Sequence, residues 1–207
     1  MSHYFETPTT AATPHQVHAT IWGRDYAFSS SAGVFSASRL DPGTAVLFRL
    51  ADPPEDRPAR FLDLGCGFGP IAAALATSCP QARVDAVDVN QRALDLTAAN
   101  AASLGLADRV SVFQPDDVPP ETQYDEIWSN PPIRIGKPAL HELLSRWLAR
   151  LAPDGRAVMV VSRNLGADSL AAWLESQTWA VQRLGSSQGF RVLCVTLRSF
   201  QTLVSTR

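Results

Sequence analysis

A stiff corner with a polar side chain at its mouth lies in residues 129–132, which read Ser-Asn-Pro-Pro. Pro131 and Pro132 have no backbone N–H and fix their own φ, so neither a helix nor a strand continues through them. The side-chain oxygen of Asn130 and the carbonyl of Pro131 are acceptors that this corner holds in place without a competing donor. A corner of this kind can present acceptors to a ligand.

A glycine-rich loop, Asp-Leu-Gly-Cys-Gly-Phe-Gly-Pro over residues 63–70, is the second candidate for chemistry. Its glycines allow a tight turn and let a ligand approach the backbone closely, beside the amino end of the helix that follows. In open α/β sheets, ligands bind in this crevice at the carboxyl ends of the strands. We therefore expect the ligand-binding residues of the loop to be Asp63, Gly65, Cys66, Gly67 and Gly69.

The kind of ligand is indicated by Asp88, which ends the second expected strand and is followed by Val89. A carboxylate at this position can accept hydrogen bonds from both hydroxyls of a ribose. The loop reads G-x-G-x-G, whereas a dinucleotide-binding loop reads G-x-G-x-x-G, and Asp63 puts negative charge where a pyrophosphate would lie. The pattern favours a nucleoside with an ammonium or sulfonium group. Either Asp116 or Asp117, after the third expected strand, could accept from an adenine amino group, or both could be solvated turn residues.

Strands and helices that would position these residues alternate from residue 60 onwards. Strands are expected at 60–64, 83–87, 110–113, 124–128 and 157–162, helices at 71–77, 92–104, 139–151 and 170–176, and a closing hairpin at 179–184 and 190–197. Repeated βα units predict a mostly parallel seven-stranded sheet with helices on both faces. The closing hairpin would add one antiparallel strand.

The amino-terminal part of the chain is expected to differ from this βα pattern. Residues 1–16 predict a flexible tail, residues 17–58 an N-terminal extension, and residues 59–200 the main domain. Within the extension, residues 17–36 predict a short hairpin. Asp41 followed by Pro42 is typical of a helix start, with an N-cap and a proline at the first helical position.

Composition excludes several classes of function. The net charge of −2 and the pI of about 6.1 lack the basic excess of proteins that hold long nucleic acids by phosphate contacts alone. No apolar run approaches the ~20 residues that cross a bilayer, and the first residues do not form a secretory signal. The three cysteines are scattered without metal-binding spacing, which predicts reduced thiols, no metal and a cytoplasmic location.

The first expected strand leads into D-x-G-x-G-x-G, the second and third strands are each followed by aspartate, and the fourth is followed by N-P-P. This order resembles the class I S-adenosylmethionine-dependent methyltransferases. Residues 33–36 and 40–44 look like the segment that precedes the sheet in the small-ribosomal-subunit RNA guanine-N2 methyltransferase family, and residues 129–133 with 136–137 look like its catalytic loop. The resemblance spans about residues 30–200 and is to a single-domain form. It implies a Rossmann-like fold, S-adenosyl-L-methionine as cofactor, and methylation of guanine N2 in ribosomal RNA or the small ribosomal subunit.

The resemblance also implies roles for individual residues. Asn130, Pro131, Pro132 and Ile133 would form the catalytic loop, in which the acceptors turn the lone pair of an exocyclic amine toward the sulfonium methyl group. Asn130 and the acidic and glycine residues named above would bind the cofactor. Beside these, Phe35, Arg134 and Lys137 are the candidate substrate-binding residues. Phe35 could cover the base or cofactor or belong to the core, and Arg134 and Lys137, which flank the loop, could contact phosphates or be ordinary solvated side chains.

Other functions stay open on the sequence. Ile133 stands where enzymes that methylate adenine N6 usually carry an aromatic residue. Methylation of a glutamine amide in a protein would use the same corner and fits the absence of basic excess. A non-catalytic module that binds the cofactor or RNA during assembly is a further alternative. The acidic pI favours an assembled particle over naked RNA, and the sequence decides neither the nucleotide nor the oligomeric state.

Overall fold

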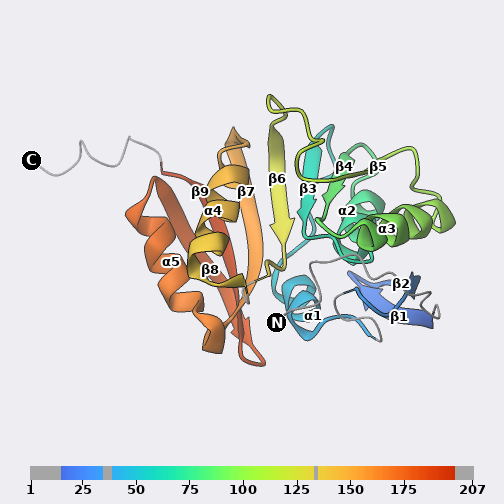
Figure 1. Ribbon diagram of the computed structural model, residues 1–207, viewed down its shortest axis with the longest axis horizontal. Helices are drawn as coiled ribbons and strands as arrows, with labels where there is room; N and C mark the ends of the chain where they lie inside the picture. Colours follow the sequence, from blue (N-terminus) through green and yellow to red (C-terminus); the bar gives the residue numbers. More distant parts are fainter. Residues whose placement is uncertain (1–14, 35–38, 133–134, 199–207) are drawn as a thin grey trace, which may run out of the picture.

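The computed structural model of the protein describes residues 15–34, 39–132 and 135–198. Seven strands form one sheet, which Figure 1 shows with the strands side by side. The strands are β3 (Arg60–Leu64), β4 (Arg83–Val87), β5 (Val110–Phe113), β6 (Tyr124–Ser129), β7 (Leu151–Ser162), β8 (Trp179–Ser187) and β9 (Phe190–Leu197), in the order β5-β4-β3-β6-β7-β9-β8. The pairs from β5 to β7 are parallel, and β9 is antiparallel to both of its neighbours. The predicted Rossmann-like α/β fold is confirmed.

Helices cover both faces of the sheet because its strands bury side chains on both faces. Successive residues alternate between two hydrophobic clusters: Phe61 and Val158 belong to one, and Leu62 and Met159 to the other. The first cluster includes α1 (Pro42–Leu50), α2 (Pro70–Ser78) and α3 (Gln91–Ser103), and the second includes α4 (Lys137–Leu148) and α5 (Ala167–Ser176). A 3-10 turn, η3 (Arg163–Leu165), connects β7 to α5.

The amino-terminal hairpin, β1 (His15–Ile21) with β2 (Arg24–Ser30), packs onto the first cluster. The indole nitrogen of Trp22 donates to the carbonyls of Phe48 and Ala51 at the end of α1, at 3.1 and 3.0 Å. The Trp22 ring also meets Trp128 of β6 edge-on. Figure 1 shows the hairpin and α1 together at the end of the sheet toward which the β6 arrow points. The N-terminal extension is therefore built into the carboxyl edge of the sheet, where ligands bind in this class of fold.

Several boundaries differ from the prediction, and the largest difference is at the start of β7. The helix expected at 139–151 ends at Leu148, and β7 begins at Leu151, passing through Pro153 and Gly155. Those residues were expected to form a loop, but the pairing of β6 with β7 shifts register here, and such a bulge accommodates proline and glycine. A Cβ on Gly155 would lie 2.9–3.0 Å from three carbonyl oxygens, so the close approach of the two strands requires glycine. The closing hairpin also turns more tightly than expected, at Gln188 and Gly189.

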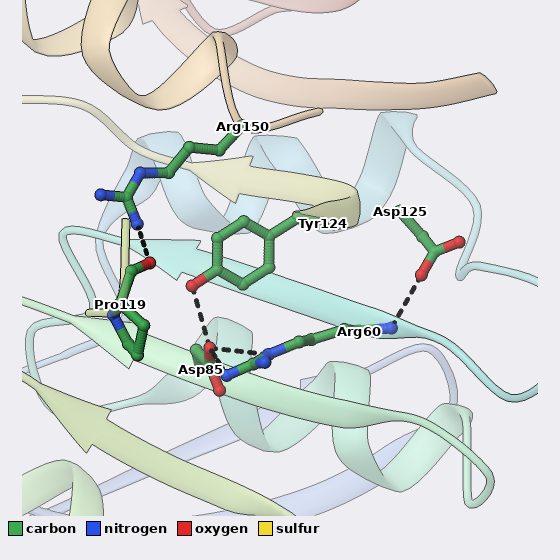
Figure 2. Close-up of polar contacts among 6 residues, drawn as sticks. All are labelled: Arg60, Asp85, Pro119, Tyr124, Asp125 and Arg150. Atoms are coloured by element: carbon green, nitrogen blue, oxygen red, sulfur yellow. Dashed lines mark hydrogen bonds and ion pairs between the residues drawn. The ribbon is translucent and has the colours of Figure 1, made fainter. Parts of the chain in front are cut away.

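A buried polar network joins the amino ends of the central strands, away from the carboxyl edge. The carboxylate of Asp85, 3% exposed, accepts from the Tyr124 hydroxyl at 2.9 Å and from Nε of Arg60 at 3.0 Å, as Figure 2 shows. Nη2 of Arg60 lies 2.7 Å from the same carboxylate oxygen. Asp125 accepts from the backbone N–H of Arg60 and pairs with Arg57 at the surface. These contacts tie β3, β4 and β6 together where no ligand is expected.

Replacing Asp85 by alanine is expected to lower the free energy of unfolding by about 3 kcal/mol, because Arg60 and the Tyr124 hydroxyl lose their shared acceptor inside the protein. Urea denaturation followed by tryptophan fluorescence measures this change. Arg57→Ala, which breaks only the exposed pair with Asp125, serves as the control and should cost less than about 1 kcal/mol. Equal losses for the two variants would show that the network is not a main support of the sheet.

Candidate active site

A cavity of about 680 Å³ opens at the carboxyl ends of the central strands, a size typical of small-molecule sites. Three predicted segments meet in it: the glycine loop, the turn after β4 and the Asn-Pro-Pro corner after β6. The predicted site residues that line it are Gly65, Cys66, Gly67, Asp88, Val89, Asn130, Pro131 and Pro132. Segments that lie far apart in the chain, at residues 65–67, 88–89 and 130–132, are thus brought together.

The glycine loop is shaped for close approach of a ligand to its backbone. The N–H groups of Gly65 and Cys66 both donate to the carbonyl of Val87, at 2.8 and 3.1 Å, which fixes the loop against the end of β4. Gly65 and Gly67 have φ of +79° and +58°, a conformation that glycine adopts without strain. Burial raises the pKa of the Cys66 thiol, so this side chain stays a neutral wall of the loop rather than a nucleophile.

Gly69 serves a different purpose from the one predicted for it. A Cβ at this position would lie 2.9 Å from Cγ2 and 3.2 Å from Cα of Thr97 on α3. Its own φ is +88°. Gly69 is absent from the cavity lining and allows the start of α2 to pack against α3. The third glycine therefore supports the loop through helix packing.

Asp63 lies behind the glycine loop and is fully buried. One carboxylate oxygen accepts from the backbone N–H of Ala72 at 2.9 Å, and the other has no partner among the described residues. Burial, with a smaller effect of Asp88, raises the pKa of Asp63 from 3.8 to about 8. Asp63 does not itself line the cavity, so the direct contact with a ligand that the sequence predicts for it is not seen, and its carboxylate lies beneath the loop.

The stability of the ligand-free protein is expected to fall as the pH rises from 4 towards 8, because the raised pKa of Asp63 makes the folded state hold its proton more tightly than the unfolded state. Asp63→Asn cannot ionise and should lose this contribution. The free energy of unfolding of the variant, relative to that of the wild type, should therefore rise by about 1 kcal/mol or more between pH 5 and pH 9. Urea denaturation at pH 5, 7 and 9 measures it; parallel curves for the two proteins would contradict the assignment.

Asp88 is held rigidly at the cavity wall. One of its carboxylate oxygens accepts from the backbone N–H of Gly67 at 3.1 Å, and the other accepts from that of Asn90 at 2.9 Å. Burial raises the pKa of Asp88, and these backbone hydrogen bonds oppose the rise. Beside it, Val89 is 50% exposed and lines the cavity. A carboxylate next to an exposed apolar side chain suits a ribose with a flat base stacked beside it.

The Asn-Pro-Pro corner is anchored by the start of α1. Nδ2 of Asn130 donates to Oδ1 of Asp41 at 2.7 Å and to Oγ1 of Thr44 at 3.1 Å. The hydroxyl of Ser129 donates to the carbonyl of Leu64 at 2.7 Å, which locks the end of β6 to β3. Both prolines line the cavity. Asp41 and Thr44 also line the cavity, whereas the sequence indicated only a helix start and, through residues 40–44, the segment of the family resemblance.

Several predicted site residues lie elsewhere. Oδ1 of Asp116 pairs with Nη2 of Arg146 at 2.8 Å, its side chain is 89% exposed, and neither Asp116 nor Asp117 lines the cavity. Pro115 of the same turn does line it. Lys137, the first residue of α4, is exposed and also absent from the lining. The remaining predicted residues, Phe35, Ile133 and Arg134, lie outside the described residues.

Other residues of the cavity wall carried no signal in the sequence. They come from the segment before α1, from α4 and from the ends of β7 and β9: Arg39, Leu143, Trp147, Ser162 and Phe190. Phe190 reaches the cavity only because Gly43 leaves room, since a Cβ on Gly43 would lie 3.1 Å from the Phe190 ring. Pairing of β9 with β7 puts Phe190 beside Ser162. The local sequence around either residue does not predict that they are neighbours.

The described ranges contain no group of three or more His, Cys, Asp or Glu side chains arranged to hold a metal ion. All three cysteines are buried and free. No helix in this part of the chain is long and apolar enough to span a membrane.

Comparison with known proteins gives the family. A family model described as the methyltransferase small domain matches residues 25–194. The uncharacterized protein YbxB of Bacillus subtilis (strain 168) is 29% identical over 92% of this chain and 96% of its own length. The ribosomal RNA small subunit methyltransferase C of Hahella chejuensis (strain KCTC 2396) is 36% identical over 77% of this chain and 46% of its own length. The chain thus spans most of YbxB but about half of the second relative.

A solved structure supports the same fold. The T. thermophilus 16S rRNA N2 G1207 methyltransferase (RsmC), in complex with AdoMet and guanosine, superposes with a TM-score of 0.77 at 24% sequence identity. The match covers 92% of this chain and 52% of that chain. The family match extends over most of the sequence and includes all three cavity segments. The chain therefore belongs to the methyltransferase small domain family, whose cofactor is S-adenosylmethionine.

Proposed function

We propose that the protein transfers a methyl group from S-adenosylmethionine to N2 of a guanine in small-subunit ribosomal RNA. The observation that carries this proposal is the orientation of Asn130 at the cavity wall, with both N–H bonds of its amide engaged by α1. Its side-chain oxygen is then left as an acceptor for an incoming amine. The ribosomal RNA methyltransferase that covers 77% of this chain supports the substrate class.

The residues at the cavity wall fit the cofactor. The positive-φ backbone at Gly65 and Gly67 leaves space for the methionine part, and Asp88 offers its carboxylate to the two ribose hydroxyls. Val89 and Pro115 provide apolar surface for the adenine. Bound there, S-adenosylmethionine supplies an electrophilic methyl group on a sulfonium centre.

The chain itself contributes orientation and charge stabilisation. The lone pair of an exocyclic amine is delocalised into the base, which makes the nitrogen a poor nucleophile. When the Asn130 side-chain oxygen and the Pro131 carbonyl each accept one N–H, the nitrogen lone pair is turned toward the methyl group, and positive charge that develops on nitrogen is stabilised. The nitrogen becomes acidic once it is alkylated and releases its proton to water. No strong base is therefore needed.

Methylation of a glutamine amide in a protein is the second candidate. A primary amide offers the same two N–H bonds to Asn130 and Pro131. The net charge of −2 favours this candidate, because an enzyme that recognises RNA by its phosphates usually carries basic excess. An assembled ribosomal subunit, which supplies shape in place of charge attraction, reconciles this charge with an RNA substrate.

One experiment separates the candidates. Purified protein is incubated with methyl-labelled S-adenosylmethionine and, in parallel, small ribosomal subunits that lack the modification, naked ribosomal RNA, DNA, or ribosome-associated proteins. We expect label in RNA as N2-methylguanosine, more from assembled subunits than from naked RNA, and none with Asn130→Ala. Label confined to protein would overturn the RNA proposal in favour of the amide. Binding of the cofactor without transfer to any acceptor would indicate a non-catalytic module.

A further inference from the structure

The carboxylate of Asp41 connects a helix terminus to the catalytic corner. Its Oδ1 accepts from the backbone N–H of Gly43 at 2.7 Å and from that of Thr44 at 3.2 Å, which caps α1. The same oxygen accepts from Nδ2 of Asn130 at 2.7 Å, across 89 positions of sequence. Capping accounts for the first two contacts. The third has no role in the helix and fixes a side chain of the cavity wall.

This contact decides which end of the Asn130 amide faces the acceptor substrate. A carboxylate only accepts hydrogen bonds, so the amide nitrogen and not the amide oxygen must face Asp41. The second amide N–H is directed to Oγ1 of Thr44 at 3.1 Å. Rotation of the amide by 180° would set its oxygen against the Asp41 carboxylate and present an NH₂ group to the amine. That orientation repels an amine N–H instead of accepting it.

The surroundings hold Asp41 itself in one place. A Cβ on Gly43 would lie 2.9 Å from Oδ1 of Asp41 and 3.1 Å from the Phe190 ring, so the carboxylate and the ring of β9 both pack closely against Gly43 at the helix start. Its negative charge also lies at the amino end of α1, where the helix dipole stabilises it. The Asp41 carboxylate, which accepts from Asn130, is thus held in place by the start of α1.

We propose that Asp41 is a positioning residue for methyl transfer, which acts by holding the Asn130 amide in its acceptor-out orientation, with Thr44 as the second contact. The kinetic part of this inference rests on the proposed function, since it requires a methyl acceptor. The role differs from contact with substrate: Asp41 acts through Asn130. Loss of Asp41 should therefore slow the transfer step and leave binding of cofactor and acceptor nearly unchanged.

Asp41→Ser separates positioning from capping. Serine is an equally good N-cap, so α1 stays capped, but its hydroxyl is too short to replace the carboxylate at Asn130. We expect kcat to fall about 100-fold, with the KM for the acceptor and the Kd for S-adenosylhomocysteine within about threefold of wild type and with little change in Tm. Asp41→Asn retains an acceptor of the same size and should recover most of the activity. Asp52→Ser, a replacement of an exposed aspartate beyond the other end of α1, is the matched control.

A second readout needs no substrate. In protein labelled with ¹⁵N at asparagine side chains, the Asn130 amide is identified by its disappearance in Asn130→Ala. We expect slow hydrogen exchange and two well-separated proton shifts in wild type and in Asp52→Ser, and free-amide values in Asp41→Ser. An Asn130 signal unaltered by Asp41→Ser, an unchanged kcat, or a raised KM at constant kcat would each overturn the proposal. If the wild-type protein methylates no acceptor, the proposed function fails while this spectroscopic test still decides the role of Asp41.

Discussion

Replacement of Asn130 by alanine is expected to lower kcat about 10³-fold while the protein stays folded and still binds its cofactor. The side chain removed is the one acceptor at the corner that is not part of the backbone. Removing a single preorganised group that stabilises developing charge costs on the order of 10²–10³ in rate. The variant also loses the contacts to Asp41 and Thr44, but the Asp41 carboxylate still accepts from the backbone N–H groups of Gly43 and Thr44 and so caps α1. The loss should therefore appear in the transfer step rather than in folding.

Single-turnover transfer from labelled S-adenosylmethionine measures this effect, and calorimetry with S-adenosylhomocysteine measures cofactor binding separately. Ser129→Ala is the matched control, since Ser129 is the adjacent polar residue but does not line the cavity, and its hydroxyl donates to the carbonyl of Leu64. That variant should lose about 1 kcal/mol of stability and keep kcat within about fivefold. A kcat for Asn130→Ala within tenfold of wild type would contradict a role of the Asn130 side chain in methyl transfer.

Asp88→Ala is expected to weaken binding of S-adenosylhomocysteine by about 10²–10³-fold. The variant removes a carboxylate whose two oxygens are already held by the backbone of Gly67 and Asn90, so a ribose would meet it without further ordering. Two charge-assisted hydrogen bonds of about 1.5–3 kcal/mol each are lost, and part of this loss is recovered by water. Calorimetry over a series of ligand concentrations gives the dissociation constants.

Two comparisons make this result specific to the ribose. The 2′-deoxy analogue of S-adenosylhomocysteine should bind wild type markedly more weakly than the parent compound, and Asp88→Ala should no longer distinguish the two. Asp116→Ala should bind like wild type, because that side chain pairs with Arg146 outside the cavity. A large loss with Asp116→Ala would instead restore the sequence-based assignment of an adenine contact to this turn.

The segments that meet in the cavity were predictable because each is encoded locally. A short apolar run, a cluster of glycines and a proline pair each determine backbone geometry over a few residues, and the parallel sheet then brings their ends to one edge. For this reason Gly65, Asp88 and Asn130, which the sequence predicts as site residues, all line the cavity. The same logic gave β3, β4, β5 and β9 with their observed bounds.

The remainder depends on contacts between distant parts of the chain. The sequence identifies Asp41 as a helix cap but does not reveal that its oxygen also reaches Asn130. The position of Asp116 after a strand suggested a ligand contact, whereas its ion pair with Arg146 on α4 turns it outward. Helix α4 ends earlier than predicted because Leu151 pairs with Tyr124. In each case a tertiary partner overrides a valid local pattern.

The 89 positions that separate Asp41 from Asn130 also bear on the order of assembly. During synthesis, the hairpin and α1 leave the ribosome well before β6, so Trp22 has no Trp128 to pack against and Asp41 has no amide to hold. The cavity gains its last wall only when β9 brings Phe190 beside Gly43. A contact of such long range forms late, after a large loop has closed. The proposed catalytic corner is therefore expected to be complete only at the end of folding, and a nascent chain that stops short of β9 would carry the sequence motifs without a finished cavity.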